Sequence, residues 1–253
     1  MNINGNTILI TGGGSGIGLA LAERFLGENN EVIIVGRREK KLLEAQEKHP
    51  ELHIKQCDVA DQEERENLFT WVTSHFPNLN VLVNNAGIQQ RVNLKEEEHD
   101  WAQSKKELTI NIDGPLHLSM LFTPFLKSKP DASIINITSG LALSPGAWVP
   151  VYSATKAALS SFTQSLRLQV ENTNLSVIEV LPPAVNTDLG GVGMHTFGAP
   201  LDDFADTVFE ELKEGKIEIA YGDSTKRLHA SRDELKEGSK QAWQGFKKNN
   251  PGF

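Results

Sequence analysis

The sequence has one cysteine, no long apolar run and no excess of positive charge. Its single thiol, Cys57, cannot form an internal disulfide, and such low cysteine use is typical of a reducing compartment. No stretch approaches the roughly 18 apolar residues of a membrane-spanning helix. The first residues, MNINGNTILI, lack the basic start and long apolar segment of a secretion signal. We therefore expect a cytoplasmic protein that does not enter a membrane.

Negative charge outweighs positive charge, with 33 Asp and Glu residues against 25 Lys and Arg residues. The net charge of −8 argues against nucleic acid, which requires a dense basic patch, and against an acidic membrane surface. Metal-ligand spacing is also lacking. His49 and His53 are four residues apart, but Pro50 interrupts the helix that would bring them to one face. We expect no nucleic acid, membrane or metal as a partner.

What the sequence does contain is an alternation of short apolar runs with longer amphipathic ones. Several short runs are apolar throughout, which is typical of parallel strands covered on both faces. The predicted strands are Thr7–Thr11, Glu31–Val35, His53–Cys57, Val81–Asn84, Ser133–Thr138, Ser176–Leu181 and Ile217–Tyr221. The predicted helices are Gly16–Glu28, Glu39–Lys48, Gln62–His75, Lys105–Lys127, Val151–Thr173 and Leu201–Glu214.

This alternation predicts an α/β protein with a doubly wound, parallel, seven-stranded sheet of Rossmann type. Because no linker rich in proline or glycine divides the chain, we expect a single domain over residues 1–221. The glycine-rich segment Leu189–Pro200 suggests a substrate lid over about residues 188–214. The polar residues 222–253 either form a helix that docks on a neighbour or stay loose, and we expect docking.

The segment TILIT-GGGSGIG-LALAERFL places a glycine-rich turn between the first predicted strand and a helix. Such a turn lets the backbone approach a pyrophosphate and directs the N–H groups of the next helix at it. The informative spacing is Gly12, Gly16 and Gly18, and no Lys-Ser or Lys-Thr pair follows, which excludes a Walker-type nucleotide loop. Five glycines in seven residues exceed what a plain turn needs. We predict a dinucleotide-binding turn.

The end of the second predicted strand indicates which dinucleotide binds. NAD sites place an acidic residue there for the ribose 2′-hydroxyl, whereas NADP sites use arginine for the 2′-phosphate. This chain has Gly36 at the acidic position, followed by Arg37 and Arg38. A guanidinium can bind a phosphate through two hydrogen bonds, so we expect NADP(H), with NAD(H) possible. The alternative is that both arginines are solvated residues at a helix start.

Tyr152 and Lys156, in VYSATKAAL, are four residues apart and therefore share one face of a predicted helix. A cation about 4 Å from a phenol would lower its pKa by roughly three units. Tyr152 could then act as general acid in carbonyl reduction and as general base in alcohol oxidation. Ser139 ends a predicted strand, where open sheets bind ligands, and can hydrogen-bond the substrate oxygen. Each residue alone has an ordinary structural explanation.

These motifs occur in an order that resembles the short-chain dehydrogenase/reductase family, from Thr7 to about Tyr221. Within that family the chain looks most similar to the oxidoreductases of the D-alanyl-lipoteichoic-acid operon type. The segment after Leu181 matches the family motif PGxVxT, except that Pro183 replaces the glycine. The resemblance implies the catalytic residues Asn111, Ser139, Tyr152 and Lys156, with Asn111 holding a water that connects the lysine to solvent. It implies cofactor contacts from Gly12, Ser15, Gly16, Ile17, Gly18, Arg37, Arg38, Asp58, Val59, Asn85, Ala86, Gly87, Tyr152, Lys156, Pro182, Val185 and Thr187.

Two segments, Gly140–Val151 and Asp188–Pro200, are expected to form the substrate pocket. The first contains the apolar Trp148, and neither contains lysine or arginine, so we expect a neutral, partly apolar ketone or alcohol. His195, in the second, could contact the substrate, but we expect it to be a solvated loop residue. The resemblance implies a homodimer or homotetramer packed through the helices that contain Asn111 and Tyr152.

Three functions follow from these observations. The first is an NADP(H)-dependent oxidoreductase acting on a ketone or secondary alcohol. The second is an NADP(H)-binding redox sensor without turnover, although a sensor would not need all four catalytic residues. The third, a sugar-nucleotide epimerase, would need a larger C-terminal domain than the residues after Val185 supply.

Overall fold

The computed structural model describes residues 1–96 and 100–253 of the chain. Seven parallel strands form one sheet in the order β3-β2-β1-β4-β5-β6-β7, so the predicted Rossmann-type sheet is confirmed. The order reverses between β1 and β4, which is where open α/β sheets bind ligands. The strands are β1 Thr7–Thr11, β2 Glu31–Gly36, β3 His53–Gln56, β4 Leu79–Asn84, β5 Ala132–Ile137, β6 Leu175–Leu181 and β7 Glu218–Ala220.

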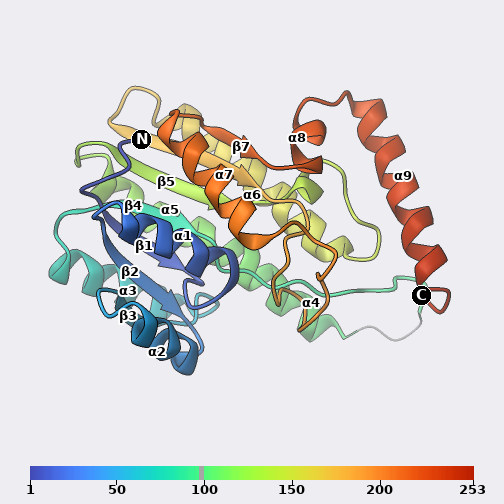
Figure 1. Cartoon of the computed structure of the whole chain (residues 1–253), viewed down its shortest axis with the longest axis horizontal. Helices are drawn as coiled ribbons and strands as arrows, with labels where there is room; N and C mark the ends of the chain where they lie inside the picture. Colours follow the sequence, from blue (N-terminus) through green and yellow to red (C-terminus); the bar gives the residue numbers. More distant parts are fainter. Residues whose placement is uncertain (97–99) are drawn as a thin grey trace.

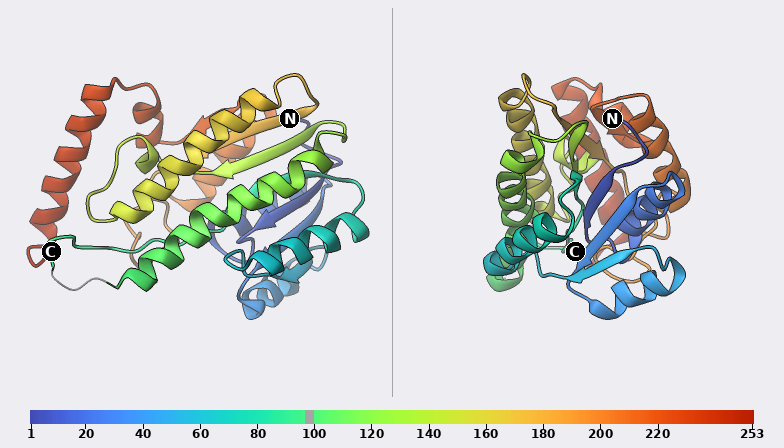
Figure 2. Two further views of the ribbon diagram at one scale, coloured as in Figure 1. Left: turned by 180° about the vertical axis from the view of Figure 1, so that it is seen from behind. Right: turned by 90° about the vertical axis from the view of Figure 1, so that its left-hand side faces the viewer.

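Helices cover both faces of this sheet, with one hydrophobic core on each face (Figure 1, Figure 2). In β1 the side chains of Ile8 and Ile10 enter one core, and that of Leu9 enters the other, because successive strand residues point to opposite faces. The first core lies under α1 (Gly16–Gly27), α2 (Glu39–Lys48) and α7 (Leu201–Lys213). The second lies under α3 (Gln62–His75), α5 (Gly114–Leu126) and α6 (Pro150–Gln169).

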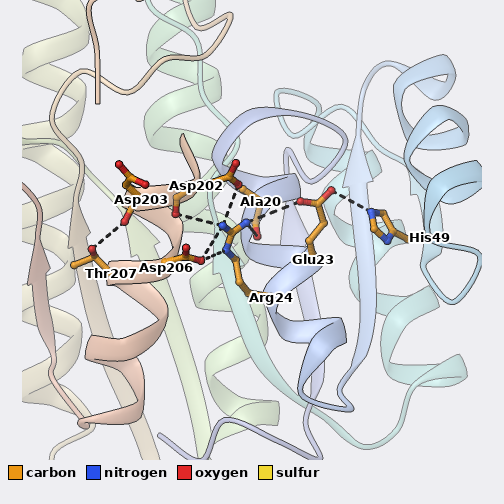
Figure 3. Close-up of polar contacts among 8 residues, drawn as sticks. All are labelled: Ala20, Glu23, Arg24, His49, Asp202, Asp203, Asp206 and Thr207. Atoms are coloured by element: carbon orange, nitrogen blue, oxygen red, sulfur yellow. Dashed lines mark hydrogen bonds and ion pairs between the residues drawn. The ribbon is translucent and has the colours of Figure 1, made fainter. Parts of the chain in front are cut away.

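Helix α7, which makes up most of the second half of the expected lid, is anchored to α1. Phe204 and Val208 of α7 are fully buried in the core that α7 shares with α1. Arg24 of α1 forms ion pairs with Asp202 at 3.0 Å and with Asp206 at 2.8 Å (Figure 3). Helix α7 thus belongs to the packed layers. The rest of the expected lid, which is the segment before α7, lies outside them.

The helical run that precedes β5 differs from the single long helix expected over Lys105–Lys127. It begins earlier, as α4 (Trp101–Leu108), and passes through a π-helical turn (Thr109–Asp113) into α5. Asp100 caps α4 by accepting a hydrogen bond from the N–H of Gln103 at 3.2 Å. A π-helical turn widens the helix locally and is frequent at functional sites.

Residues after β7 form two helices, α8 (Asp223–Leu228) and α9 (Arg232–Asn249). Ser231 and Glu234 make reciprocal hydrogen bonds that cap the start of α9. Helix α9 runs along the edge of the molecule away from the sheet (Figure 1), and none of its residues is fully buried. Within residues 1–96 and 100–253, no helix combines the length and apolar character needed to cross a membrane.

Candidate active site

The glycine turn between β1 and α1 presses directly against the loop that follows β4. A Cβ atom on Gly12, which has a φ of +66°, would lie 2.9 Å from the Cα atom of Ala86. A Cβ atom on Gly18 would lie 2.5 Å from the carbonyl oxygen of Gly12. Ser15 precedes α1 in an extended conformation, and its side chain makes no capping hydrogen bond to the helix. Close backbone and available helix N–H groups are what a pyrophosphate requires, so the turn fits a dinucleotide.

Buried and partly buried hydrogen bonds hold the loop after β4 in place. The hydroxyl of Thr11 accepts from the N–H groups of Asn85 at 3.0 Å and Ala86 at 3.1 Å, while the Asn85 amide donates to the Thr11 carbonyl at 2.9 Å. The Asn84 amide donates to the Asn136 side chain of β5 at 2.9 Å. The Asn-Asn-Ala-Gly segment therefore joins the ends of β1, β4 and β5 beneath the glycine turn.

The end of β2 brings an arginine to the glycine turn. Arg38 donates from Nη2 to the Ser15 hydroxyl at 3.2 Å, and the neighbouring Arg37 is exposed. The predicted adenine contact, Asp58, accepts from the N–H of Ala60 at 3.0 Å and is partly exposed. The adjacent Val59 is buried. Among these residues, Arg38 is the one that a described hydrogen bond joins to the glycine turn, and Asp58 and Val59 follow β3, next to β2 in the sheet.

Asn111 lies in the π-helical turn and is almost fully buried. Its Oδ1 atom accepts from the N–H of Ile88 at 2.9 Å, and its amide donates to the Ile88 carbonyl at 2.8 Å and the Thr155 hydroxyl at 3.1 Å. Both N–H donors are used, so a water could contact only Oδ1 or the main chain. A Cβ atom on Gly87 would lie 3.3 Å from Asn111 Oδ1 and 3.7 Å from Lys156 Nζ. The absence of a side chain at Gly87 thus leaves room between these two groups.

Tyr152 and Lys156 project from one face of α6, and Ser139 lies two residues after the end of β5. All three are buried, and the Ser139 side chain lies close enough to the Tyr152 phenol to affect its pKa. Lys156 Nζ donates to the Ile137 carbonyl at 2.8 Å and lies 5.6 Å from the centre of the Tyr152 ring. The structure thus brings together the asparagine, serine, tyrosine and lysine that the sequence placed far apart.

The electrostatics of this cluster differ from the expected ones. We expected Lys156 to lower the pKa of Tyr152, but burial raises the pKa of this phenol, and the Ser139 side chain opposes that rise only in part. Burial also lowers the pKa of Lys156 to about 8. The expectation was wrong because taking a phenolate out of water is costly, and the nearby charge of Glu107 raises the pKa of Tyr152 further.

The segment after β6 crosses over the glycine turn. Pro182 accepts at its carbonyl from the N–H of Gly140 at 2.9 Å, and Val185 is buried. A Cβ atom on Gly16 would lie 3.4 Å from the Thr187 methyl carbon. The segment that carries Pro183 in place of the family glycine therefore connects the turn with the loop that follows Ser139. Ile17, the second residue of α1, is partly buried.

Comparison with known proteins agrees with this geometry. The family model for short chain dehydrogenases matches residues 6–193. The chain belongs to this family. It is 46% identical over 238 residues to the uncharacterized oxidoreductase DltE of Bacillus subtilis, covering 92% of this chain and 93% of that protein. It is 31% identical over 195 residues to human 15-hydroxyprostaglandin dehydrogenase [NAD(+)], covering 74% of this chain and 71% of that protein.

Solved structures of short-chain dehydrogenases share the fold. The enzyme from Burkholderia cenocepacia J2315, solved in complex with NADP, matches with a TM-score of 0.78 and 25% identity, over 98% of both chains. The enzyme from Streptomyces avermitilis matches with a TM-score of 0.81 and 24% identity, over 96% of this chain and 97% of that one. The family membership and the resemblance to the DltE type are therefore confirmed.

A buried carboxyl group in this short-chain dehydrogenase was not anticipated from its sequence. Glu107, one turn before Asn111, is 0% exposed; its Oε1 atom accepts from the N–H of Gln90 at 3.1 Å, and its Oε2 atom has no partner within the described part of the chain. Burial raises the pKa of Glu107 to about 7, and the charge of Lys156 opposes this rise. The sequence could predict only that Glu107 lies in an amphipathic helix. Its burial could not be predicted, because the residues that interact with it, Gln90 and Lys156, come from other segments.

The segment expected to form a lid contacts the loop after β4 through a histidine. His195 Nε2 lies 3.1 Å from the Gln89 side-chain oxygen, and its ring is half-buried. Burial lowers the pKa of His195, and the nearby Arg91 charge acts in the same direction. His195 is therefore a contact between the segment before α7 and the loop after β4, rather than the solvated residue that we expected.

The C-terminal helices pack against the substrate loops of the same chain. The ring of Phe246 in α9 stacks on Trp148 with the ring centres 5.0 Å apart, and it also lies beneath the guanidinium of Arg91. The Ser144 hydroxyl donates to the Leu235 carbonyl at 3.2 Å. Within this chain, α9 thus packs against the segment that follows Ser139. That segment is one wall of the expected substrate pocket.

Proposed function

We propose that this short-chain dehydrogenase is an NADP(H)-dependent oxidoreductase that transfers hydride between nicotinamide and a ketone or secondary alcohol. The observation that carries the proposal is the convergence of Asn111, Ser139, Tyr152 and Lys156 at the carboxyl end of the sheet, beside the glycine turn. Membership of the family supports the coarser assignment, an NAD(P)-dependent oxidoreductase.

In the reducing direction, the Ser139 hydroxyl would donate a hydrogen bond to the substrate carbonyl and hold it beside Tyr152. Reduced nicotinamide, when bound, supplies the hydride that the carbonyl carbon accepts, so the electron pair of the C=O bond moves to the oxygen. Tyr152 Oη then gives its proton to that oxygen, and the alcohol leaves. In the oxidising direction the same phenol takes the proton.

The proton on Tyr152 must be replaced after each reduction. Lys156 shares a helix face with Tyr152 and has a pKa of about 8, so it exchanges protons near neutral pH. Asn111 acts as a positioning residue, because its side chain ties the loop at Ile88 to α6 at Thr155. This bracing fixes the distance between α6 and the loop after β4.

Preference for NADP(H) is supported by the end of β2. No acidic side chain occupies the position of Gly36, and the guanidinium of Arg38 lies beside the glycine turn through its bond to Ser15. Exposed Arg37 can turn toward the same place. A ribose 2′-phosphate bound there would meet two cations, whereas a 2′-hydroxyl would gain little from them.

We also propose that the protein forms a homodimer or homotetramer and is located in the cytoplasm. Met120 of α5 and Leu168 of α6 are large apolar side chains exposed by 66% and 69%. The small residues Ala154 and Ala157 are also exposed on α6. A partner packed against these two helices would cover this apolar surface.

The proposal is tested with panels of ketones plus NADPH and of secondary alcohols plus NADP⁺, followed by the absorbance of NADPH. Tyr152→Phe should lower turnover by about 10²- to 10⁴-fold, since it removes the proton donor, while NADPH affinity stays nearly unchanged. Tyr221→Phe is the matched control, because Tyr221 is the second of the two tyrosines and packs against Phe204 in the core. Full activity in Tyr152→Phe would contradict the mechanism, and tight NADPH binding without any turnover would favour a redox sensor.

A further inference from the structure

A pocket of about 360 Å³ lies between the loop that follows Ser139 and the two C-terminal helices. Its polar lining comes from Ser144 on one side and from Lys226, Arg227, His229 and Glu234 on the other. The pocket is thus built from two segments that are far apart in the sequence, one of which begins at a residue proposed to be catalytic.

The charge of this pocket is opposite to that of the whole chain. The chain carries a net charge of −8, yet two cationic side chains and a histidine line the pocket against one acidic side chain. That acid, Glu234, already accepts hydrogen bonds from the backbone and hydroxyl of Ser231 at the start of α9. Lys226 pairs with Asp223 at 3.0 Å. Arg227 is therefore the cation of the pocket lining that makes no ion pair within the described part of the chain.

Arg227 differs from the other partly buried arginines. Arg24 binds two aspartates, Arg65 binds the Val59 carbonyl at 2.6 Å, and Arg167 binds Glu218 and two carbonyls. The Arg227 guanidinium is partly buried but has no hydrogen bond or ion pair to any residue in 1–96 or 100–253. Burial lowers its pKa, and Asp223 offsets this only in part. A partly buried guanidinium that makes no direct ion pair gains free energy when a ligand supplies an anion at hydrogen-bond distance.

Gly140 connects this arginine to the active site. A Cβ atom on Gly140 would lie 3.3 Å from Arg227 Nη1 and would collide with the hydroxyl of Ser224, which is fully buried and has no partner in the described part of the chain. Helix α8 thus packs against the residue that directly follows Ser139. Covalent geometry then places Arg227 Nη1 no more than about 11 Å from Ser139 Oγ. A single small molecule can span that distance.

We propose that this pocket binds an oxyanion of the substrate, a carboxylate or phosphate, through Arg227, while the reacting carbonyl or hydroxyl lies between Ser139 and Tyr152. This inference rests on the proposed function. It replaces the neutral substrate expected from the two substrate loops, because the cation comes from α8, which lies in neither loop. The substrate class becomes a keto or hydroxy compound that carries its anionic group several atoms from the reacting carbon.

Matched pairs of substrates test the proposal with NADPH as the reductant. Oxo-fatty acids of increasing chain length are compared with their methyl esters, and dihydroxyacetone phosphate is compared with dihydroxyacetone. For at least one pair, wild type should favour the anionic member by about tenfold or more in kcat/KM, the value of one charge-assisted hydrogen bond. Arg227→Gln should remove this preference by raising KM for the anion, with the neutral member unaffected. Arg227→Lys should retain part of it, and Lys240→Gln, an exposed change on α9, should retain all of it.

A binding measurement separates this proposal from the proposed function. Octanoate and inorganic phosphate are titrated against wild type and Arg227→Gln by calorimetry in the presence of NADP⁺. Binding of either probe that weakens about tenfold in Arg227→Gln supports the pocket even if no ketone turns over, an outcome that counts against the proposed function alone. Equal use of charged and neutral members by wild type, or anion binding that does not depend on Arg227, overturns the proposal.

Discussion

The two sides of this active site are built in different ways. The cofactor side, formed by Gly12–Gly18 and Asn84–Gly87, brings backbone against backbone, with no space for a Cβ atom at Gly12 or Gly18. The substrate side consists of residues 140–149 and 188–200 with helices α8 and α9. It is held by side chains such as Trp148 and Phe246, and α9 buries no residue fully.

This difference has a physical origin. Backbone-to-backbone contact excludes side chains, so the cofactor side must keep glycines at fixed spacing and is visible as a motif. Contacts between side chains at a partly exposed surface can be made by many residue types. The substrate side therefore carries no comparable motif, and loops of this kind are where related folds differ in function.

The largest expected effect concerns Glu107, which lies where the two sides meet and faces the charge of Lys156. Its folded pKa of about 7 is above its unfolded value near 4.5, so the stability it contributes is present at low pH and is lost as pH rises through 7. Glu107→Gln should remove this loss, on the order of 3 kcal/mol in unfolding free energy between pH 4.5 and 8. Denaturant unfolding across this range measures it.

Glu171→Gln, a change at an exposed glutamate of the same charge, is the control for Glu107→Gln. The control should keep the pH dependence of the wild type. If Glu107→Gln also keeps the pH dependence of the wild type, burial does not hold the Glu107 carboxyl group protonated. Water would then reach this group, which the structure shows as buried.

The second effect concerns the rigidity of the cofactor side. Gly18→Ala would place a methyl group 2.5 Å from the Gly12 carbonyl oxygen, and such overpacking costs about 1–3 kcal/mol. We expect NADPH affinity to fall about 10- to 100-fold, measured by fluorescence titration. Gly27→Ala, at the end of α1 where no atom lies within 4 Å of a Cβ, should leave it unchanged. Equal affinity in both variants would mean that the cofactor side is as adaptable as the substrate side.

The third effect tests which dinucleotide the cofactor side selects. Replacing Arg37 and Arg38 together by glutamine should weaken NADPH binding about tenfold or more and leave NADH binding nearly unchanged, because only NADPH carries the 2′-phosphate. Replacing Lys40 and Lys41 of α2 by glutamine removes the same charge nearby and serves as the control. A similar loss for both dinucleotides in the arginine variant would remove the basis for NADP(H) preference.

The smallest effect concerns the substrate side. Phe246→Ala removes the stacked ring that joins α9 to Trp148 and should weaken the docking of α9 by about 1 kcal/mol. Faster amide exchange in α9, with KM raised and NADPH affinity unchanged, is the expected result. Gln244→Ala, on the exposed part of α9, should show none of these changes. Altered NADPH affinity in Phe246→Ala would show that the two sides are coupled.

Much of the fold could be predicted from the sequence, because strands buried on both faces are apolar throughout and alternate with amphipathic helices. Predicted boundaries failed where tertiary contacts compete with local preference. The helix expected from Lys105 to Lys127 contains a π-helical turn, in which Asn111 bonds to Ile88 and Thr155. Nothing in the local sequence specifies these partners.

The sequence by itself determined the Rossmann-type sheet, the glycine turn and the shared helix face of Tyr152 and Lys156, because each depends on residue type at short spacing. Only the tertiary structure decided the electrostatics of the site. Burial raises the pKa of Tyr152, and the unforeseen Glu107 faces Lys156. The tertiary structure also brings the Arg227 guanidinium close to Gly140. Burial and charge pairing depend on which distant segments meet, and that is settled only when the chain has folded.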